Sequence, residues 1–286
     1  MNPRELNFQG NSPLLYLIAT PIGNLSEMSP RALQVLSETD YIAAEDTRNS
    51  GQLMAHFSIH KPFLSCHEHN ENEAADKIVS LLKEGKKVCY MSDAGYPTLS
   101  DPGQRLVQRC LEAGIKISVT SGPSAAIDAL SVSGLDSSHF YFEGFLPAKE
   151  SEKDAELRDL AQRQETIIFY ESPHRIHKTL VSMASILGDR KAVIARELTK
   201  AHEEIIRGTL DEFVALDEDT LRGEMVLVVE GSKEKKEAPN ERSILDAVLS
   251  EIKAGKKAKE AVKNVSERLG IPKNAVYDLY LKSKED

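Results

Sequence analysis

Cysteine and long apolar runs are scarce in this sequence, and each scarcity argues against a class of protein. The three cysteines, Cys66, Cys89 and Cys110, lie far apart and form no CxxC pair, so the sequence indicates neither a disulfide framework nor a zinc knuckle. No apolar run approaches the roughly 20 residues of a membrane-spanning helix. Residues 1–13 lack the apolar core of a signal peptide. We therefore expect a cytoplasmic protein with reduced thiols and a flexible N-terminus at residues 1–13.

The sequence also lacks an excess of positive charge. Its 36 lysines and arginines against 45 aspartates and glutamates give a formal net charge of −9, which disfavours a protein that coats nucleic acid indiscriminately. The apolar share of 41% and the charged share of 28% are typical of a globular chain. Any RNA or DNA site is therefore expected to be confined to a local basic patch.

Strand and helix patterns alternate through the first half of the chain. The predicted strands are residues 14–20, 41–46, 86–92 and 115–120, and the predicted helices are 29–38, 72–85 and 103–113. Ser29 is expected to cap the first helix, with Pro30 at its first position. Because the strands are nearly continuous apolar runs, we expect parallel strands buried on both faces, in an α/β domain at residues 14–138.

A second α/β domain is predicted at residues 139–231. Its expected strands are 139–147, 166–172, 191–198, 203–210 and 223–231, with helices at 149–164 and from Ser172 and Pro173. The strands within 191–210 are close enough in sequence to be antiparallel neighbours. Residues 232–240 are charged and poor in apolar residues, which indicates a linker. Residues 241–286 predict three short helices, either a helix-turn-helix or a plain three-helix module.

Three loops rich in glycine and proline follow predicted strands of the first domain, where open α/β sheets bind ligands. They are TPIGN (20–24), SDAGYPTLSDPG (92–103) and TSGPSAA (120–126). None matches GxGxxG or GxxxxGK[ST], which disfavours a dinucleotide or nucleoside triphosphate site. Such loops can bring backbone groups close to a small ligand. Asp93 could contact that ligand or stabilise the turn, whereas Asp101 is expected to cap the next helix.

Polar clusters follow several strands, at residues 44–50, 65–73, 170–175 and 195–204. Their basic side chains could neutralise phosphates or pair with neighbouring carboxylates, and both interpretations stay open at this point. His67 and His69 project to opposite sides of an extended segment, so we expect no metal site there.

Nine segments, in this order, resemble the ribosomal-RNA-modifying branch of the bacterial tetrapyrrole methylase superfamily. They are LIATPIGNL, AEDTRNS, CHEHNE, SDAGYPTLSDPG, TSGPSAA, EGFLP, YESPHR, ARELTK and GEMVLVVEG, between about Leu14 and Gly231. The first loop is poorer in glycine than in corrin and porphyrin methylases, and HEHN and SPHR are typical of the RNA-modifying branch. The resemblance implies two α/β domains of the class III methyltransferase type and a homodimer.

The resemblance further implies S-adenosylmethionine as cofactor and a cytidine ribose 2′-hydroxyl of small-subunit (16S) ribosomal RNA, near the decoding centre, as acceptor. The partner would be this RNA or the assembled 30S subunit, with no membrane involved. The motif positions implied to bind the cofactor are Pro21, Asp93, Ala94, Gly95, Tyr96, Ser124, Ala125, Tyr170, Ala195 and Met225.

Methyl transfer from a sulfonium to a hydroxyl needs alignment of the two atoms and a group to receive the proton. We expect Glu45 and Asp46 to act there, with Lys200 as alternative base or oxyanion partner. The expected RNA contacts are Arg48, His67, Arg175, Arg196, Lys256, Lys257 and Lys259. The alternatives are a methylase of a tetrapyrrole-like small molecule or of a protein, and a ligand-sensing regulator that binds DNA.

Overall fold

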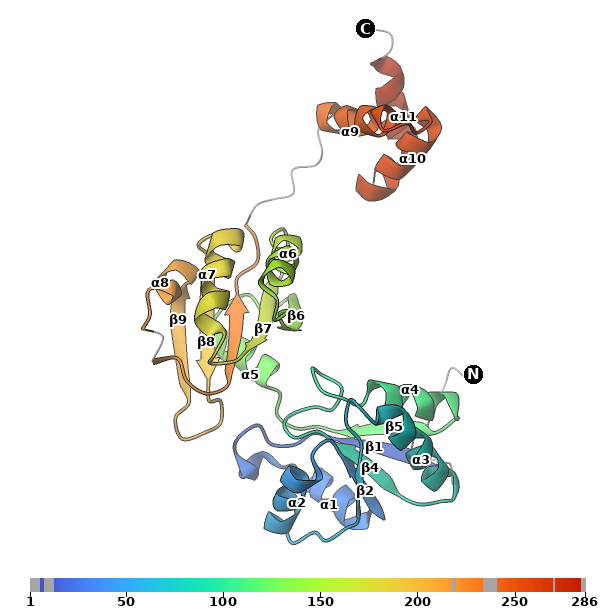
Figure 1. Ribbon diagram of the computed structural model, residues 1–286, viewed down its shortest axis with the longest axis vertical. Helices are drawn as coiled ribbons and strands as arrows, with labels where there is room; N and C mark the ends of the chain where they lie inside the picture. The colour runs from blue at the N-terminus through green and yellow to red at the C-terminus, as the bar shows by residue number, and fades with distance from the viewer. Residues whose placement is uncertain (1–5, 8–12, 218–219, 234–240, 270, 284–286) are drawn as a thin grey trace. The chain divides into compact units, whose positions relative to one another are not determined.

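The computed structural model describes residues 6–7, 13–217, 220–233, 241–269 and 271–283 (Figure 1). Most of the predicted N-terminal segment 1–13 and of the predicted linker 232–240 lies outside these residues. The chain forms two compact units, one ending at Ser232 and the other starting at Lys233. None of the helices in the described parts of the chain is both long and apolar enough to span a membrane.

The first unit begins with a parallel five-stranded sheet in the order β3-β2-β4-β1-β5, which confirms the predicted parallel pairing. Its strands are β1 (Leu14–Ile18), β2 (Tyr41–Ala44), β3 (Phe63–Ser65), β4 (Val88–Met91) and β5 (Lys116–Thr120). The helices beside it are α1 (Pro30–Glu38), α2 (Thr47–His56), α3 (Glu71–Lys83) and α4 (Gln104–Glu112), with a short 3₁₀ turn, η1, at Leu25–Glu27.

Helices cover both faces of this sheet, and successive side chains of each strand point to opposite faces. In β1, Leu15 packs with residues of α3 and α4, whereas Ile18 packs with residues of α1 and α2. The predicted start of α1 is confirmed, since the Ser29 hydroxyl accepts a hydrogen bond from the Ala32 N–H at 3.2 Å. Helix α2 was not predicted, because its mostly polar sequence lacks the helical spacing of apolar residues.

The second sheet has the order β6-β7-β10-β8-β9. Its strands are β6 (Phe140–Phe145), β7 (Thr166–Glu171), β8 (Lys191–Arg196), β9 (Glu204–Thr209) and β10 (Met225–Val229). Strands β6 and β7 are parallel and the other neighbours are antiparallel, so the predicted antiparallel pair within residues 191–210 is confirmed. The helices of this half are α5 (Ala125–Ser133), α6 (Glu150–Leu160), α7 (Ile176–Leu187) and α8 (Leu210–Val214).

Strand β10 shows how the second sheet is covered. Met225, Leu227 and Val229 share a buried cluster with side chains of α6, α7 and α8. Val226 and Val228 point to the other face and pack with side chains of α5. The predicted helix start at Ser172 and Pro173 is wrong by one turn, since α7 begins at Ile176 and the intervening residues form a turn.

All three cysteines are buried in the first half of the molecule. Burial raises the pKa of Cys66 and of Cys89 to about 12, and that of Cys110 to about 11. The reactive form of cysteine is the thiolate, so these side chains serve as small apolar core residues.

The second unit consists of α9 (Glu241–Lys253), α10 (Ala258–Leu269) and α11 (Lys273–Lys282). Val248, Val262, Val265, Val276 and Tyr280 contribute to one buried cluster shared by the three helices. The predicted three helices are confirmed. The residue Gly270 of the predicted turn lies outside the described residues.

Candidate cofactor cavity and polar hollow

The three glycine- and proline-rich loops meet at the carboxyl ends of β1, β4 and β5. Thr20 and Gly95 form a two-way backbone bridge, with N–H to oxygen distances of 2.9 and 3.1 Å. The Tyr96 hydroxyl accepts a hydrogen bond from the Gly122 N–H at 3.2 Å. Loop 92–103 therefore joins the other two loops into one wall.

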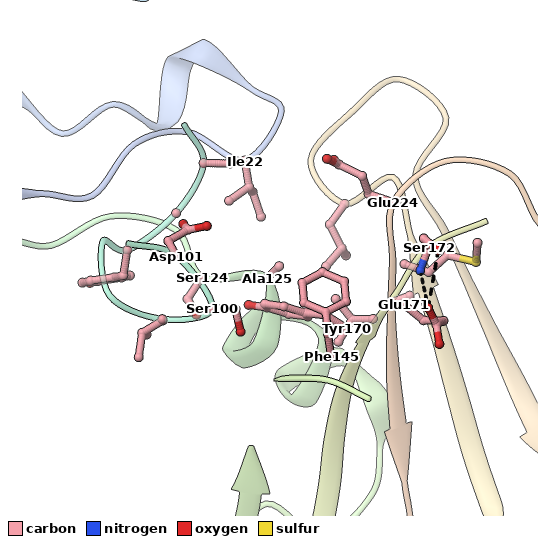
Figure 2. Close-up of a pocket in the computed structure, with 18 of the residues that line it drawn as sticks. Ile22, Ser100, Asp101, Ser124, Ala125, Phe145, Tyr170, Glu171, Ser172 and Glu224 are labelled. Carbon is pink, nitrogen blue, oxygen red and sulfur yellow. Dashed lines mark hydrogen bonds between the residues drawn. The ribbon is translucent and has the colours of Figure 1, made fainter. Parts of the chain in front are cut away.

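This wall borders a cavity of about 300 Å³, whose opposite side is formed by residues of the second sheet (Figure 2). The lining residues are Ile22, Ala94, Gly95, Tyr96, Leu99, Ser100, Asp101, Ser124, Ala125, Phe145, Tyr170, Glu171, Ser172, Pro173, Ala195, Leu198, Glu224, Met225 and Val226. The size falls within the range of small-molecule sites.

Eight of the ten positions expected to bind a cofactor line this cavity: Ala94, Gly95, Tyr96, Ser124, Ala125, Tyr170, Ala195 and Met225. The other two lie elsewhere. Pro21, in the first loop, is buried and does not line the cavity, and the Asp93 side chain lines the polar hollow described below, where it accepts a hydrogen bond from Asn49 at 2.8 Å. Sequence reasoning missed apolar lining residues such as Ile22, Leu99 and Leu198, although each lies inside a segment that it had singled out.

The expectation that Asp101 caps α4 is wrong. The N-cap residue is Gly103. The Glu71 carboxylate accepts hydrogen bonds from the backbone N–H groups of Gly103, Arg105 and Leu106 at the start of α4. A side chain more than thirty residues away in sequence took the capping role, and the local pattern SDPG carried no signal of it. Asp101 is thereby available to line the cavity.

The carboxyl group of Asp101 is partly buried on the cavity wall. Burial, together with the nearby charges of Glu45 and Asp93, raises its pKa from 3.8 to about 6, although a hydrogen bond from Ser92 acts in the opposite direction. Within the described residues, Asp101 has no ion pair with a lysine or arginine. Figure 2 shows it on the side of the cavity opposite Glu224.

A separate polar hollow of about 430 Å³ is lined by Glu45, Asp46, Thr47, Arg48, Ser65, His67 and Asp93. Because Asp93 lines the hollow and the next residue, Ala94, lines the cavity, the two spaces share one wall. Four of the residues expected to act in catalysis or RNA binding are brought together there: Glu45, Asp46, Arg48 and His67.

Of the three acidic residues that line the hollow, Glu45 and Asp46 differ in their pKa. Partial burial and the neighbouring charge of Asp93 raise the pKa of Glu45. Asp46 instead caps α2 and pairs with Arg48 at 2.8 Å, and the hydrogen bonds from Arg48 lower its pKa to about 2. Glu45 is therefore the better proton acceptor of the two near neutral pH.

Lys200 does not line the hollow, and its side chain lies against Gly23 of the first loop. Its ammonium group contacts Glu197 at 3.0 Å and Glu224 at 2.8 Å. Partial burial works against its charge, but these two carboxylates raise its pKa overall. Such a group stays protonated near neutral pH, which favours an electrostatic role over that of a base.

Most of the expected RNA-binding arginines have partners inside the chain. Arg175 donates to the carbonyl oxygens of Leu146 and Pro147 and pairs with Glu171, and Arg196 pairs with Glu204. The side chain of Arg48 is 87% exposed despite its pairing with Asp46. In the second unit, Lys256, Lys257 and Lys259 lie exposed at the turn between α9 and α10.

Comparison with known proteins agrees with this geometry. The family described as Tetrapyrrole (Corrin/Porphyrin) Methylases matches residues 14–214. The chain belongs to the tetrapyrrole methylase family. It is a methyltransferase, and its methyl donor is S-adenosylmethionine.

Curated members of this family resemble the chain over nearly its whole length. Ribosomal RNA small subunit methyltransferase I of Bacillus subtilis (strain 168) is 44% identical over 285 residues, covering 97% of this chain and 98% of that protein. The protein of the same name from Escherichia coli O157:H7 is 43% identical, covering 97% of each chain.

Solved structures of methylases share the fold. A uroporphyrin-III-C-methyltransferase from Thermus thermophilus has a TM-score of 0.55 at 19% identity, over 76% of this chain and 94% of its own. The methyltransferase CobJ has a TM-score of 0.59 at 18% identity, over 79% of this chain and 96% of its own. The methylase architecture is thus found in proteins of very different sequence.

The residues around the cavity fit S-adenosylmethionine. Side chains such as Ile22, Phe145 and Val226 offer apolar surfaces to an adenine ring. Ala125, the first residue of α5, lines the cavity, and a helix N-terminus attracts an anion such as the methionine carboxylate. The Asp101 carboxylate suits a cationic ligand. The cavity therefore offers a helix N-terminus to an anionic group of the ligand and a carboxylate to a cationic group.

Proposed function

We propose that this protein transfers a methyl group to the ribose 2′-hydroxyl of a cytidine in small-subunit ribosomal RNA, near the decoding centre. The observation that carries the proposal is the nearly end-to-end similarity, at 44% identity, to a ribosomal RNA small subunit methyltransferase I. A cytoplasmic location and a homodimer belong to the same proposal, and sedimentation velocity would measure the dimer. Bound S-adenosylmethionine supplies an electrophilic methyl group on a sulfonium sulfur.

The polar hollow is the proposed entrance for the acceptor nucleotide. It shares the wall at residues 93–94 with the cofactor cavity, so a ribose held there would lie next to the methyl donor's site. The Nδ1 atom of His67 is buried and has no hydrogen-bond partner among the described residues, which leaves it available to the nucleotide. Arg48 is suited to a phosphate because its guanidinium is exposed at the rim.

In the proposed reaction the bond between sulfur and methyl breaks while the bond between methyl and the 2′-oxygen forms. The hydroxyl proton passes to a carboxylate, and we assign this role to Glu45. Its raised pKa makes it a better proton acceptor than Asp46, whose carboxylate pairs with Arg48 and caps α2. Lys200, held by Glu197 and Glu224, would stabilise charge near the cavity without taking the proton.

The acceptor can be identified by offering labelled S-adenosylmethionine together with immature small ribosomal subunits, protein-free ribosomal RNA and tetrapyrrole-like small molecules. We expect label in the subunit RNA, and nuclease digestion with mass spectrometry should yield 2′-O-methylcytidine. Label on a small molecule, on a protein or on a base would contradict the proposal and support a different methylase. Binding to duplex DNA without methyl transfer would instead support a regulator.

Lys256, Lys257 and Lys259 form a basic turn between α9 and α10, and we propose that this turn binds the phosphates of RNA. Reversing the charge of Lys257 and Lys259 to glutamate should raise the KM for ribosomal subunits about 10-fold and weaken its salt dependence, with an unchanged Kd for S-adenosylmethionine. Lys256 is left intact because it pairs with Glu251 at 3.0 Å. A matched control reverses Lys83 and Lys86, which are exposed on the first unit. Equal effects of the two double variants would remove this role from the turn.

A further inference from the structure

We propose that Glu71 is a positioning residue for the cofactor, acting through loop 92–103. It is the first residue of α3 and is only 6% exposed. One carboxylate oxygen, Oε1, accepts the N–H groups of Gly103 at 3.0 Å, Arg105 at 2.8 Å and Leu106 at 3.2 Å. A buried carboxylate of one helix thus fixes the start of another, at the point where the cavity loop ends.

The loop needs such an anchor because its backbone is strained. Thr98 and Ser100 have φ values of 75° and 60°, in the left-handed region that residues other than glycine rarely adopt. Gly103 has a φ of 124°, and a Cβ atom there would lie 2.5 Å from the Tyr90 ring. Conformations of this kind persist only where the surrounding contacts hold them.

The anchors of the loop are divided between its two ends. The backbone bridge of Gly95 with Thr20 and the bond from Gly122 to Tyr96 hold the first part. Glu71 holds the last part. Between them lie Leu99, Ser100 and Asp101, which line the cavity. Release of the Glu71 end would therefore let these three residues relax away from the cofactor while the first part stays in place.

The charge of Glu71 contributes as well as its hydrogen bonds. A carboxylate near a helix N-terminus interacts favourably with the helix dipole, and Glu71 lies at the N-termini of both α3 and α4. Hydrogen bonds to a charged acceptor are also stronger than those to a neutral one. A glutamine would keep an oxygen at this position without the charge, so it should rescue part of the function that alanine loses.

The test compares Glu71→Ala, Glu71→Gln and a control, Leu82→Ala, whose side chain is fully buried on the same helix and takes no part in the hydrogen bonds to Gly103, Arg105 and Leu106. Thermal unfolding measures stability, and calorimetry well below the unfolding temperature measures the Kd for S-adenosylmethionine. We expect the Kd to rise about 10-fold in Glu71→Ala, which removes the hydrogen-bond acceptor. In Glu71→Gln the Kd should rise about 3-fold, because the acceptor is kept without its charge. Leu82→Ala should keep the wild-type Kd despite its lower stability.

Equal Kd values for Glu71→Ala and Leu82→Ala would overturn the proposal. If Glu71→Ala does not fold, the comparison of Glu71→Gln with Leu82→Ala decides, and a wild-type Kd for the glutamine variant counts against a role of the charge in positioning. The inference rests on the assignment of the cavity to the cofactor. A variant that fills the cavity, Ala125→Phe, separates the two: normal cofactor binding by that variant would refute the cavity itself, whatever Glu71 does.

Discussion

Replacing Ala125 with phenylalanine should raise the Kd for S-adenosylmethionine at least ~100-fold, equivalent to about 2.7 kcal/mol of binding free energy. Ala125 is the first residue of α5 and lines the cavity, so the added ring would occupy space that the cofactor needs. The side chain is only partly buried, and the fold should accept the larger residue. Isothermal titration calorimetry measures the Kd, and methylation of ribosomal subunits should fall in parallel.

The matched control is Ile127→Phe. Ile127 lies two residues further along the same helix, is 46% exposed and does not line the cavity. We expect this variant to bind S-adenosylmethionine as the wild type does. An Ala125→Phe protein that unfolds at the wild-type temperature and still binds the cofactor normally would show that the cofactor lies elsewhere.

Asp101→Asn should weaken binding of S-adenosylmethionine about 30-fold, because a carboxylate that faces a cation in a partly buried site is worth roughly 1.5–3 kcal/mol. The demethylated product carries a neutral sulfur, so its Kd should change less, and the ratio of the two Kd values serves as an internal control. In the wild type the affinity for S-adenosylmethionine should fall as the pH drops through about 6, where Asp101 takes up a proton. An unchanged ratio of Kd values in Asp101→Asn would contradict this assignment.

The same substitution should stabilise the protein near neutral pH. The pKa of Asp101 is raised in the folded state above its ordinary value of 3.8, so the folded state binds this proton more tightly. The resulting stabilisation is complete below about pH 4 and is lost as the pH rises through about 6. Since the carboxyl group is partly exposed, we discount the effect to about 1 kcal/mol in the free energy of unfolding. Thermal unfolding of both proteins across this pH range measures it.

A gain in stability with a loss of cofactor affinity would have a simple physical meaning. A charge placed where the fold does not favour it is retained for its effect on a ligand. Urea unfolding near neutral pH provides an independent check, since a lower midpoint for Asp101→Asn would contradict the sign of this effect.

Local patterns predicted most strands and several helix starts, because both depend on neighbouring residues, but the three-residue strand β3 and helix α5 were not predicted. Ser29 and Pro30 mark the start of α1, and the apolar residues Val88–Met91 within the predicted strand 86–92 form the buried strand β4. Helix α2 was not predicted because residues Thr47–His56 are mostly polar. Its N-cap residue, Asp46, lies within a polar cluster that was interpreted as part of a catalytic or RNA-binding site.

The lining of the cavity was predictable where residues of the glycine- and proline-rich loops form it, and not where tertiary contacts determine a side chain's role. Asp101 and Glu71 illustrate the difference. Sequence spacing placed Asp101 in a capping position. The N–H groups of a helix N-terminus can donate to any suitably placed oxygen, and in the folded chain that oxygen belongs to Glu71. The raised pKa of Asp101 likewise depends on burial and then on the charge of Glu45, and both arise only in the folded chain.

Because Cys66, Cys89 and Cys110 are buried and their pKa values are raised, we expect thiol-specific reagents to leave them unmodified in the folded protein. A single cysteine introduced at an exposed position, such as Lys257 or Arg48, would be the one site that maleimides label in the folded state. Fluorophores or cross-linkers attached there can report which surfaces approach the ribosomal subunit, without prior removal of the native thiols. The packing of three small side chains thus makes the wild-type sequence a ready scaffold for mapping its own substrate complex.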